Sequence, residues 1–278
     1  MERYVANTGV KTQPRMPAPS LLYLYGVVRP DFDPSRAPAG LDDERVETLR
    51  AGAHALLVSR VSASAYAPEV VERRSGEMDW ITPRAMAHDR VLSWAQMHGG
   101  IVPMSMFSLW SEEGALTQSI AAKSDALGQT FARVGNADEY GLRVHRRDRE
   151  MATIVHELDP EIASLRRDAA AATPGQRYLI ERKIAERSKQ AIRAAAQRLA
   201  RDAYEALKQH ARESKLLPAT PSTSAPDDTT LVLNAAFLVA RDRLDAFRAE
   251  VATHATSAEP RGLTFDFTGP WPPYNFVS

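Results

Sequence analysis

Hydrophobic residues in the first half of the chain are grouped in short runs of the kind that form strands. Residues 21–28 (LLYLYGVV) are continuous and rich in β-forming side chains, which predicts a central strand covered on both faces. Runs at 45–49 and 55–61 are separated by a glycine and predict a hairpin. Residues 101–107 predict a further strand, and Pro103 indicates a sheet edge, because proline donates no hydrogen bond to a neighbouring strand.

Helical spacing appears between and after these runs. Thr82 and Pro83 predict the start of a helix, because a hydroxyl cap followed by proline suits the first turn, and the glycines at 99–100 predict its end. A single helix is expected over 111–134, followed by a strand at 140–145. Helices that alternate with antiparallel strands are typical of an α+β sandwich of ferredoxin-like character.

The second half of the chain is mainly helical. Pro160 interrupts a first apolar stripe, and Thr173 with Gln176 three residues later forms the capping-box signature of a long helix. The run at 231–239 predicts a core strand, and a helix precedes the last strand. From residue 140 onward the order is strand, helix, strand, strand, helix, strand, which is again the ferredoxin-like order.

We therefore predict an α+β fold with two modified ferredoxin-like α/β-sandwich domains, the second containing a long helix and a C-terminal tail rich in proline and aromatic residues. The change to helical sequence near Asp148 places the domains at 21–147 and 148–278. Residues 1–20 contain three prolines and few large apolar side chains, and we interpret them as a disordered leader.

The last residues, 261–278, read RGLTFDFTGPWPPYNFVS. Alternating side chains predict a half-buried strand that Gly269 and Pro270 end, followed by a stiff, extended tail. Large aromatic residues are most often buried within their own chain, so the favoured interpretation is that the tail completes a core of its own fold. The alternative is a docking surface for another protein, formed by Trp271, Pro272, Pro273, Tyr274 and Phe276.

The composition is that of a globular protein of two-domain size, with 278 residues, of which 44% are hydrophobic and 25% charged. Basic and acidic residues balance at 35 each, so no general affinity for nucleic acid or for an anionic membrane is expected. The chain has no cysteine, which excludes disulfides and thiolate chemistry and fits a reducing cytoplasm. No apolar run is long enough to cross a bilayer.

The sequence has no GxGxxG, P-loop, GxSxG or HExxH pattern. His88 could act as a general base or an axial haem ligand, but a core or interface histidine is favoured, because no partner group can be assigned. His145 lies among arginines and is interpreted as a charged strand end. The acidic residues 42–44 could bind a cation, but a polar loop is favoured, because no spaced set of further ligands accompanies them. The basic residues of the long helix are interpreted as a solvated face, with RNA binding as the weaker alternative.

Several segments resemble, in the correct order, those of the gas vesicle synthesis protein family GvpF/GvpL. The segments at 23–28 (YLYGVV), 55–59 (ALLVS) and 233–239 (LNAAFLV) resemble the family's YLYGIV, LAAVVS and LNAAYLV. Residues 88–104 resemble the start of its H..V…G.VLPLRFGTVF block. The terminal TGPWPPY at 268–274 is the most specific match, since it would rarely recur by chance.

The chain departs from this family pattern at two places. Ser105 and Phe107 stand where the family has the arginine and the glycine of LRFGTVF. Gln176 and Arg177 replace the arginine and the alanine of the family's GRAYL. Any partner contact that these positions make in relatives is therefore not carried over to this chain, and the substitutions indicate a diverged paralogue.

The resemblance implies a minor, cytoplasmic gas vesicle protein that helps vesicle assembly, without enzymatic activity or a cofactor. It also implies association with the small hydrophobic shell protein GvpA and with other accessory proteins of the vesicle. Shielding or orienting the shell subunit would use an edge strand, which Pro103 marks, or a groove, and the aromatic tail and the long helix are the candidate surfaces. The candidate protein-binding residues are Pro103, His88 and those of the aromatic tail. The alternative function is a haem- or small-molecule-binding enzyme on paired ferredoxin-like domains, using His88 or His145.

Overall fold

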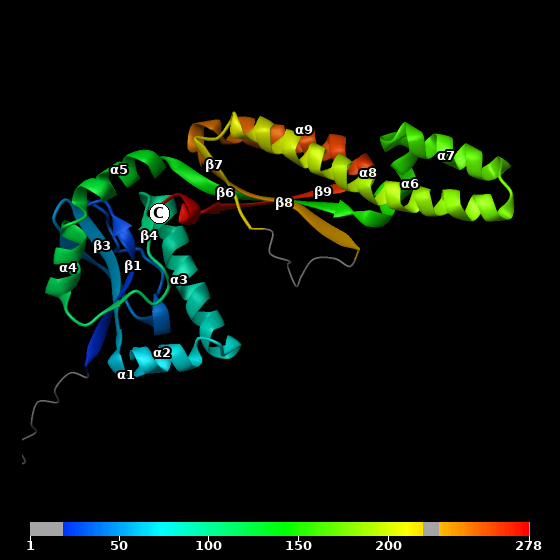
Figure 1. The fold of residues 1–278 in the computed structure, drawn as a ribbon. Helices are drawn as coiled ribbons and strands as arrows, with labels where there is room; N and C mark the ends of the chain where they lie inside the picture. The colour runs from blue at the N-terminus through cyan, green and yellow to red at the C-terminus, as the bar shows by residue number, and fades with distance from the viewer. Residues whose placement is uncertain (1–18, 219–227, 278) are drawn as a thin grey trace, which may run out of the picture.

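The computed structural model describes residues 19–218 and 228–277, which form two antiparallel sheets with helices packed against each (Figure 1). The leader predicted at 1–20 lies outside these residues, except for its last two positions. The first sheet has the strand order β2-β3-β1-β4, with β5 also paired to β1, and the second has the order β7-β8-β6-β9. When the strands are numbered within each sheet, both sheets have the same order, with the second, third, first and fourth strands side by side.

The first domain contains the predicted central strand and hairpin. Its strands are β1 (Ser20–Val28), β2 (Val46–Ala51), β3 (His54–Ser62), β4 (Val102–Pro103) and β5 (Leu109–Trp110). Its helices are η1 (Leu41–Asp43), α1 (Ala63–Tyr66), α2 (Pro68–Arg74), α3 (Met78–His98), α4 (Glu113–Ala121) and α5 (Ser124–Val134). A loop with the short helix η1 replaces the first crossover helix of a full ferredoxin-like unit.

Strand β1 is buried on both faces, as its continuous apolar run predicts. Tyr23 and Tyr25 belong to the core beneath α3, whereas Leu24 belongs to the core beneath α4 and α5. Gly26 lets β4 approach closely, because a Cβ atom at this position would lie 2.6 Å from the Val102 carbonyl oxygen. The two faces of one strand therefore organise both cores of the first domain.

The second domain has the predicted order of strand, helix, strand, strand, helix, strand. Its strands are β6 (Ala137–Arg147), β7 (Glu213–Leu216), β8 (Thr229–Ala240) and β9 (Leu263–Trp271). Its α-helices are α6 (Asp148–Leu158), α7 (Pro160–Ala171), α8 (Pro174–Lys208) and α9 (Leu244–Ala258). Short 3-10 helices are η2 (Arg241–Arg243), η3 (Glu259–Arg261) and η4 (Tyr274–Phe276).

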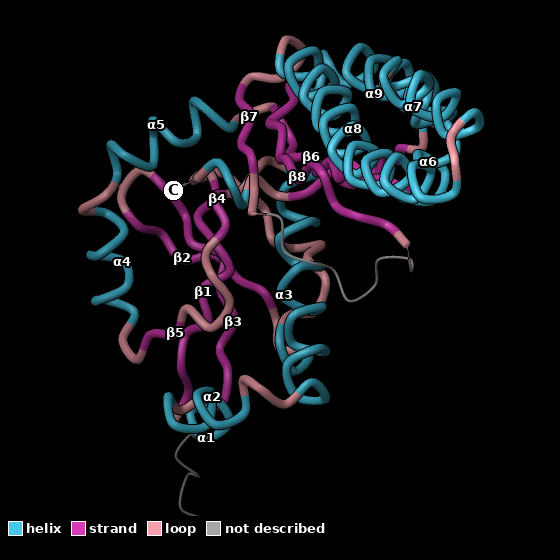
Figure 2. The backbone as a smooth tube through the Cα atoms, turned by 45° about the vertical axis from the view of Figure 1, so that its right-hand side comes forward, coloured by secondary structure: helices cyan, strands magenta, loops and turns pink. Residues whose placement is uncertain are grey.

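These four α-helices are grouped on one side of the second sheet (Figure 2). Leu142 and Val144 of β6 pack into one core with Ala196 of α8 and Phe247 of α9. The capping box predicted at the start of α8 is present, and α8 is the long helix that crosses this core. The other face of the sheet presents polar residues such as Thr264, which is exposed.

The second sheet begins with β6, so the boundary between the sheets differs from the expected position between 147 and 148. β6 pairs with β8 along its full length, from Ala137 opposite Ala240 to the last residue of the strand, and with β9 on its other side. The change to helical sequence therefore marks the end of the first strand of this domain. Only residues 135–136 separate α5 from β6.

Helix α3 begins a turn earlier than predicted. It begins at Met78, because the Trp80 side chain is 4% exposed and fixes the first turn against the core. Pro83 therefore lies inside the helix, where its missing N–H removes one hydrogen bond. The single helix predicted over 111–134 is divided into α4 and α5 by a break at 122–123.

The strand predicted at 101–107 is limited to β4, and the backbone then turns at Phe107, whose φ is 64°. This left-handed conformation favours glycine, which is the residue of the family pattern at this position. The Phe107 ring stacks on Trp80 with centroids 5.3 Å apart and meets Tyr23 edge-on at 6.5 Å. Phe107 thus closes an aromatic cluster at the expense of an unfavourable backbone conformation.

Substitutions at Phe107 are expected to separate these two effects. Phe107→Ala removes the ring and keeps the strain, so the free energy of unfolding should fall by about 2 kcal/mol. Phe107→Gly also removes the strain, and it should be about 1 kcal/mol more stable than Phe107→Ala. Urea unfolding of the three proteins measures both differences. An alanine variant that is more stable than the glycine variant would contradict the left-handed backbone.

Candidate functional site

The C-terminal tail returns to the junction between the two sheets. β9 continues past Gly269 and Pro270 to Trp271, which pairs with Glu139 of β6, so the strand end predicted at Gly269 and Pro270 is wrong. The chain then turns through η4, and its end lies between the two domains (Figure 1). The tail is therefore positioned by an edge strand of the second sheet and directed toward the first domain.

Phe276 anchors the tail in a small apolar core at this junction. Its side chain is 1% exposed. The other buried members of this core are Val134, Ala137, Ala236 and Leu238. The Arg133 guanidinium donates to the Phe276 carbonyl at 2.7 Å, and Val277 packs against both this core and the core beneath α4 and α5. The tail thus completes a core of its own fold, which is the interpretation favoured from the sequence.

Hydrogen bonds hold the tail to both domains. Asn275 donates from its backbone N–H and its side-chain amide to the Glu139 carboxylate, at 2.8 and 2.5 Å. The Tyr274 hydroxyl donates to Asp89 of α3 at 2.9 Å. Burial raises the pKa of Glu139, and the hydrogen bonds from Asn275 oppose that rise. The tail is therefore fixed by polar contacts to β6 on one side and to α3 on the other.

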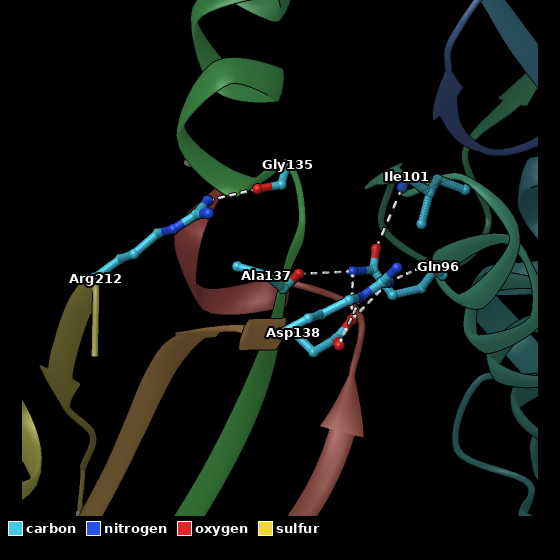
Figure 3. Close-up of polar contacts among 7 residues, drawn as sticks. Gln96, Ile101, Gly135, Ala137, Asp138 and Arg212 are labelled. Carbon is cyan, nitrogen blue, oxygen red and sulfur yellow. Dashed lines mark hydrogen bonds and ion pairs between the residues drawn. The ribbon is translucent and has the colours of Figure 1, made fainter. Parts of the chain in front are cut away.

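A polar network that includes the buried side chains of Gln96 and Asp138 joins α3 to the second sheet (Figure 3). The Gln96 amide donates to the Ala137 carbonyl and to the Asp138 carboxylate, each at 2.9 Å, and its oxygen accepts from the Ile101 N–H at 3.3 Å. The Arg241 guanidinium donates to both Asp138 oxygens at 3.0 Å and to the Gln96 carbonyl at 2.8 Å. Because Gln96 is only 5% exposed, loss of the Gln96 or the Asp138 side chain would leave the other as a desolvated polar group without this partner.

The short connection between the domains is also held by hydrogen bonds. Arg212, which precedes β7, donates to the Gly135 carbonyl (Figure 3) and to the Arg133 carbonyl at 3.3 Å. The Arg241 N–H donates to the carbonyl of Asn136 at 3.1 Å. The last carbonyl groups of α5 and of the connection are therefore paired with the second domain.

Beside this junction, α3 and the tail present apolar side chains to solvent. Met86 and Met97 are 65% and 63% exposed, and Trp271 and Tyr274 are 38% and 39% exposed. The two methionines lie three helical turns apart on one side of α3. Met97 shares a cavity of about 170 Å³ with Pro272, and Tyr274 is bonded to α3. We call Met86, Met97, Trp271 and Tyr274 the α3–tail face.

The structure divides the seven residues predicted to bind protein into two groups. Trp271 and Tyr274 are exposed. The other five are buried, namely Pro103, His88, Pro272, Pro273 and Phe276. Pro103 lies in the edge strand β4, opposite Gly26, but its side chain does not reach solvent. The exposed part of the predicted site is therefore the two aromatic residues that join the α3–tail face.

His88 is a residue of the first core. Its Nδ1 lies 2.7 Å from the Tyr23 hydroxyl, and its ring stacks on Tyr25 with centroids 5.8 Å apart. Burial lowers the pKa of His88 from 6.5 to about 4, and Asp89 opposes this with a smaller effect. His145 lies in β6 of the second sheet, so the fold does not bring the two histidines together.

The acidic residues 42–44 make a structural contact. Asp42 accepts hydrogen bonds from the Tyr66 hydroxyl at 2.8 Å and from the Arg84 guanidinium at 2.9 Å. In the part of the chain that the structure describes, no group of three His, Cys, Asp or Glu side chains is placed to hold a metal ion. The helices of residues 19–218 and 228–277 include none with the length and apolarity needed to cross a bilayer.

This arrangement of two domains has counterparts among solved structures. The crystal structure of the gas vesicle protein GvpF from Anabaena sp. PCC7120 superposes with a TM-score of 0.63 at 18% identity, covering 93% of this chain and 96% of that chain. The crystal structure of GvpF from Microcystis aeruginosa gives a TM-score of 0.62 at 19% identity, covering 93% and 99%. The fold is therefore an α+β fold of the type seen in gas vesicle proteins.

Sequence comparisons identify the family. The family model described as "Gas vesicle synthesis protein GvpL/GvpF" matches residues 21–278. Gas vesicle protein L of Streptomyces sp. (strain CB03234) is 27% identical over 267 residues, which cover 92% of each chain. Gas vesicle protein F of the same organism is 27% identical over 258 residues, covering 92% of this chain and 98% of the relative. The chain belongs to the GvpL/GvpF family, and the resemblance noted in its sequence is confirmed.

Two parts of the junction were not found from the sequence. The network of Gln96, Asp138 and Arg241 carries no motif, because its members come together only when the domains pack. The two methionines of the α3–tail face did leave a signal. Met86 and Met97 are eleven positions apart, which places them on one helix face, away from the buried residues Val91 and Leu92.

Substitutions in the tail are expected to have unequal effects on stability. Phe276→Ala leaves a cavity in the junction core, so the free energy of unfolding should fall by about 3 kcal/mol. Trp271→Ala removes a partly exposed side chain and should cost about 1 kcal/mol or less. Urea unfolding followed by circular dichroism measures both. Equal effects of the two substitutions would show that Phe276 is not an anchor.

Acid should destabilise the protein through His88. The unfolded chain binds a proton at this histidine near pH 6.5, whereas the folded protein binds it only near pH 4. The free energy of unfolding should therefore fall by about 3 kcal/mol between pH 6.5 and pH 4 from this residue alone. Chemical denaturation across this range should show a shallower pH dependence for His88→Gln than for the unmodified chain. His98→Gln, at an exposed position, should retain the full dependence.

Proposed function

We propose that this protein is an accessory factor of gas vesicle assembly that binds the hydrophobic shell protein GvpA, and other gas vesicle proteins, in the cytoplasm and at the vesicle. The observation that carries the proposal is the α3–tail face, a set of four exposed apolar side chains on a member of the GvpL/GvpF family. The role is chaperone-like and nucleating: it covers and orients the shell subunit and needs no catalysis.

The physical need for such a factor follows from the shell subunit. A protein with a large apolar surface aggregates unless that surface is covered before the protein is inserted. Methionine is suited to this task because its flexible thioether adapts to different apolar shapes. Trp271 and Tyr274 add aromatic contact area with polar groups at the edge. The α3–tail face therefore fits an apolar helix laid along α3.

The anchoring of the tail lowers the entropic cost of binding a partner at the α3–tail face. Tyr274 is tied to Asp89, and Phe276 is buried in the junction core, so the backbone that carries both exposed aromatics is already fixed. Binding then costs little additional conformational entropy. The alternative enzyme function would use His88 or His145. The His88 ring is buried against Tyr23 and Tyr25, and His145 lies in β6 of the other sheet. The surface role is therefore the function that the geometry supports best.

A pull-down with tagged GvpA tests this proposal. Met97→Glu places a carboxylate where an apolar helix would lie, and the cost of desolvating it should reduce GvpA recovery at least about tenfold. Met97 is 63% exposed, so the substitution should leave the fold intact, as circular dichroism can verify.

The matched control is Leu179→Glu on α8. Leu179 is 66% exposed, and the substitution introduces the same charge on a different surface. It should leave GvpA recovery within about twofold of the unmodified chain. Recovery that falls equally in both variants, or in neither, would contradict the α3–tail face as the binding site.

A further inference from the structure

The flank of α8 that faces β8 contains a groove. Two cavities of about 440 and 350 Å³ lie next to each other there, and both are lined by Gln197 and Val232. The floor of the larger cavity is mainly apolar and is formed by Ala200, Tyr204, Leu216, Val232 and Leu233. Leu216 is 63% exposed, which is unusual for a large apolar side chain in a strand. We call this feature the α8–β8 groove.

Arginines form the rim of the groove. Arg193 lines one cavity and Arg201 the other, and neither forms an ion pair with any residue that the structure describes. Arg146 also lines the groove but is held by Asp148 at 2.5 Å. The one acidic residue on the lining, Glu205, lies 3.6 Å from Lys208. The groove therefore carries two positive charges that are not neutralised within the described residues.

This local charge contrasts with the balance of the whole chain. α8 contains nine basic and four acidic residues, whereas the chain as a whole has 35 of each. An unpaired positive rim attracts a partner of opposite charge and fixes its position. The apolar floor excludes a partner that offers charge alone, because buried apolar area supplies most of the binding free energy.

The edge of β8 in this groove is open to a further strand. β7 pairs with β8 only from Ala235 to Leu238, and the Leu217 N–H extends this contact to the Asn234 carbonyl. On that side of β8, residues 230–233 have no strand partner among the described residues. Their outward backbone groups can pair with an added extended segment.

The spacing of the two arginines matches an extended segment. Arg193 and Arg201 are eight residues apart on α8, which corresponds to about 12 Å along the helix axis. In a strand, residues i and i+4 lie about 13 Å apart and point to the same side, as does residue i+2 between them. Carboxylates at i and i+4 would therefore meet the two arginines, while the side chain at i+2 would face the apolar floor.

We propose that the α8–β8 groove binds an extended segment of a partner protein, with acidic residues at i and i+4 and an apolar residue at i+2, added as a strand to the edge of β8. This surface lies in the second domain and is separate from the α3–tail face, so the protein has two docking surfaces of different chemistry. A nucleic acid fits less well, because Tyr204 lies partly buried with its hydroxyl 2.9 Å from Ser214 and offers no open stacking platform.

The proposal is tested with a fluorescein-labelled peptide of sequence Ser-Glu-Thr-Leu-Thr-Glu-Ser and fluorescence anisotropy on the full chain. The unmodified chain should bind the peptide, and the double substitution R193E/R201E should weaken binding at least about tenfold. The matched control is R166E/R167E on α7, which makes the same change in net charge at two exposed arginines. It should bind within about twofold of the unmodified chain.

Three comparisons make the test specific. A peptide of the same composition with adjacent glutamates should bind more weakly, because only one carboxylate can then reach an arginine. Leu216→Asn should weaken binding of the first peptide, since it makes the floor polar at an exposed position. Met97→Glu should leave the affinity for the first peptide unchanged, because Met97 belongs to the α3–tail face and not to the groove.

Other outcomes would overturn the proposal. These are no binding of the first peptide by the unmodified chain, equal binding of the rearranged peptide, and equal losses in R193E/R201E and R166E/R167E. A labelled oligouridine RNA that binds more tightly than the peptide and is lost in R193E/R201E would instead assign the groove to nucleic acid.

Discussion

The orientation of the two domains depends on the hydrogen bonds that Gln96 of α3 makes to Ala137 and Asp138 of β6. These groups are desolvated, so they are satisfied only when the second sheet lies in one position relative to α3. Phe276 fills the apolar space beside this network. Polar contacts thus specify the geometry of the junction, while the buried tail supplies much of its apolar contact. As a result, Tyr274 of the tail is hydrogen-bonded to α3, and Pro272 shares a cavity with Met97.

The sequence predicted most of the fold because its strands and helices have distinct periodicities. The continuous run of β1 and the alternation of β9 were both interpreted correctly, as was the capping box of α8. The sequence did not assign β6 to the second sheet, because β6 looks the same in sequence whichever sheet it joins. Sheet membership is decided by long-range pairing with β8 and β9, which local patterns do not contain. Helix ends also depend on tertiary packing: α3 begins before the predicted start because the Trp80 side chain is buried.

The candidate site was only partly accessible from the sequence. The tail was recognised because consecutive prolines and aromatics are unusual at a chain end, yet its composition could not tell the buried Phe276 from the exposed Trp271. The α8–β8 groove was out of reach for a different reason. It exists because β7 is shorter than β8 and because two arginines of α8 fall beside the uncovered edge. Both facts are properties of packing, and the basic residues alone suggested a solvated face.

The two-residue connection at 135–136 has a mechanical consequence. A link this short, with its carbonyls bonded to Arg212 and Arg241, leaves no slack for one domain to swing against the other. The two domains therefore keep a fixed distance and angle relative to each other. Two polypeptides bound to its separate domains are therefore held in one fixed orientation relative to each other.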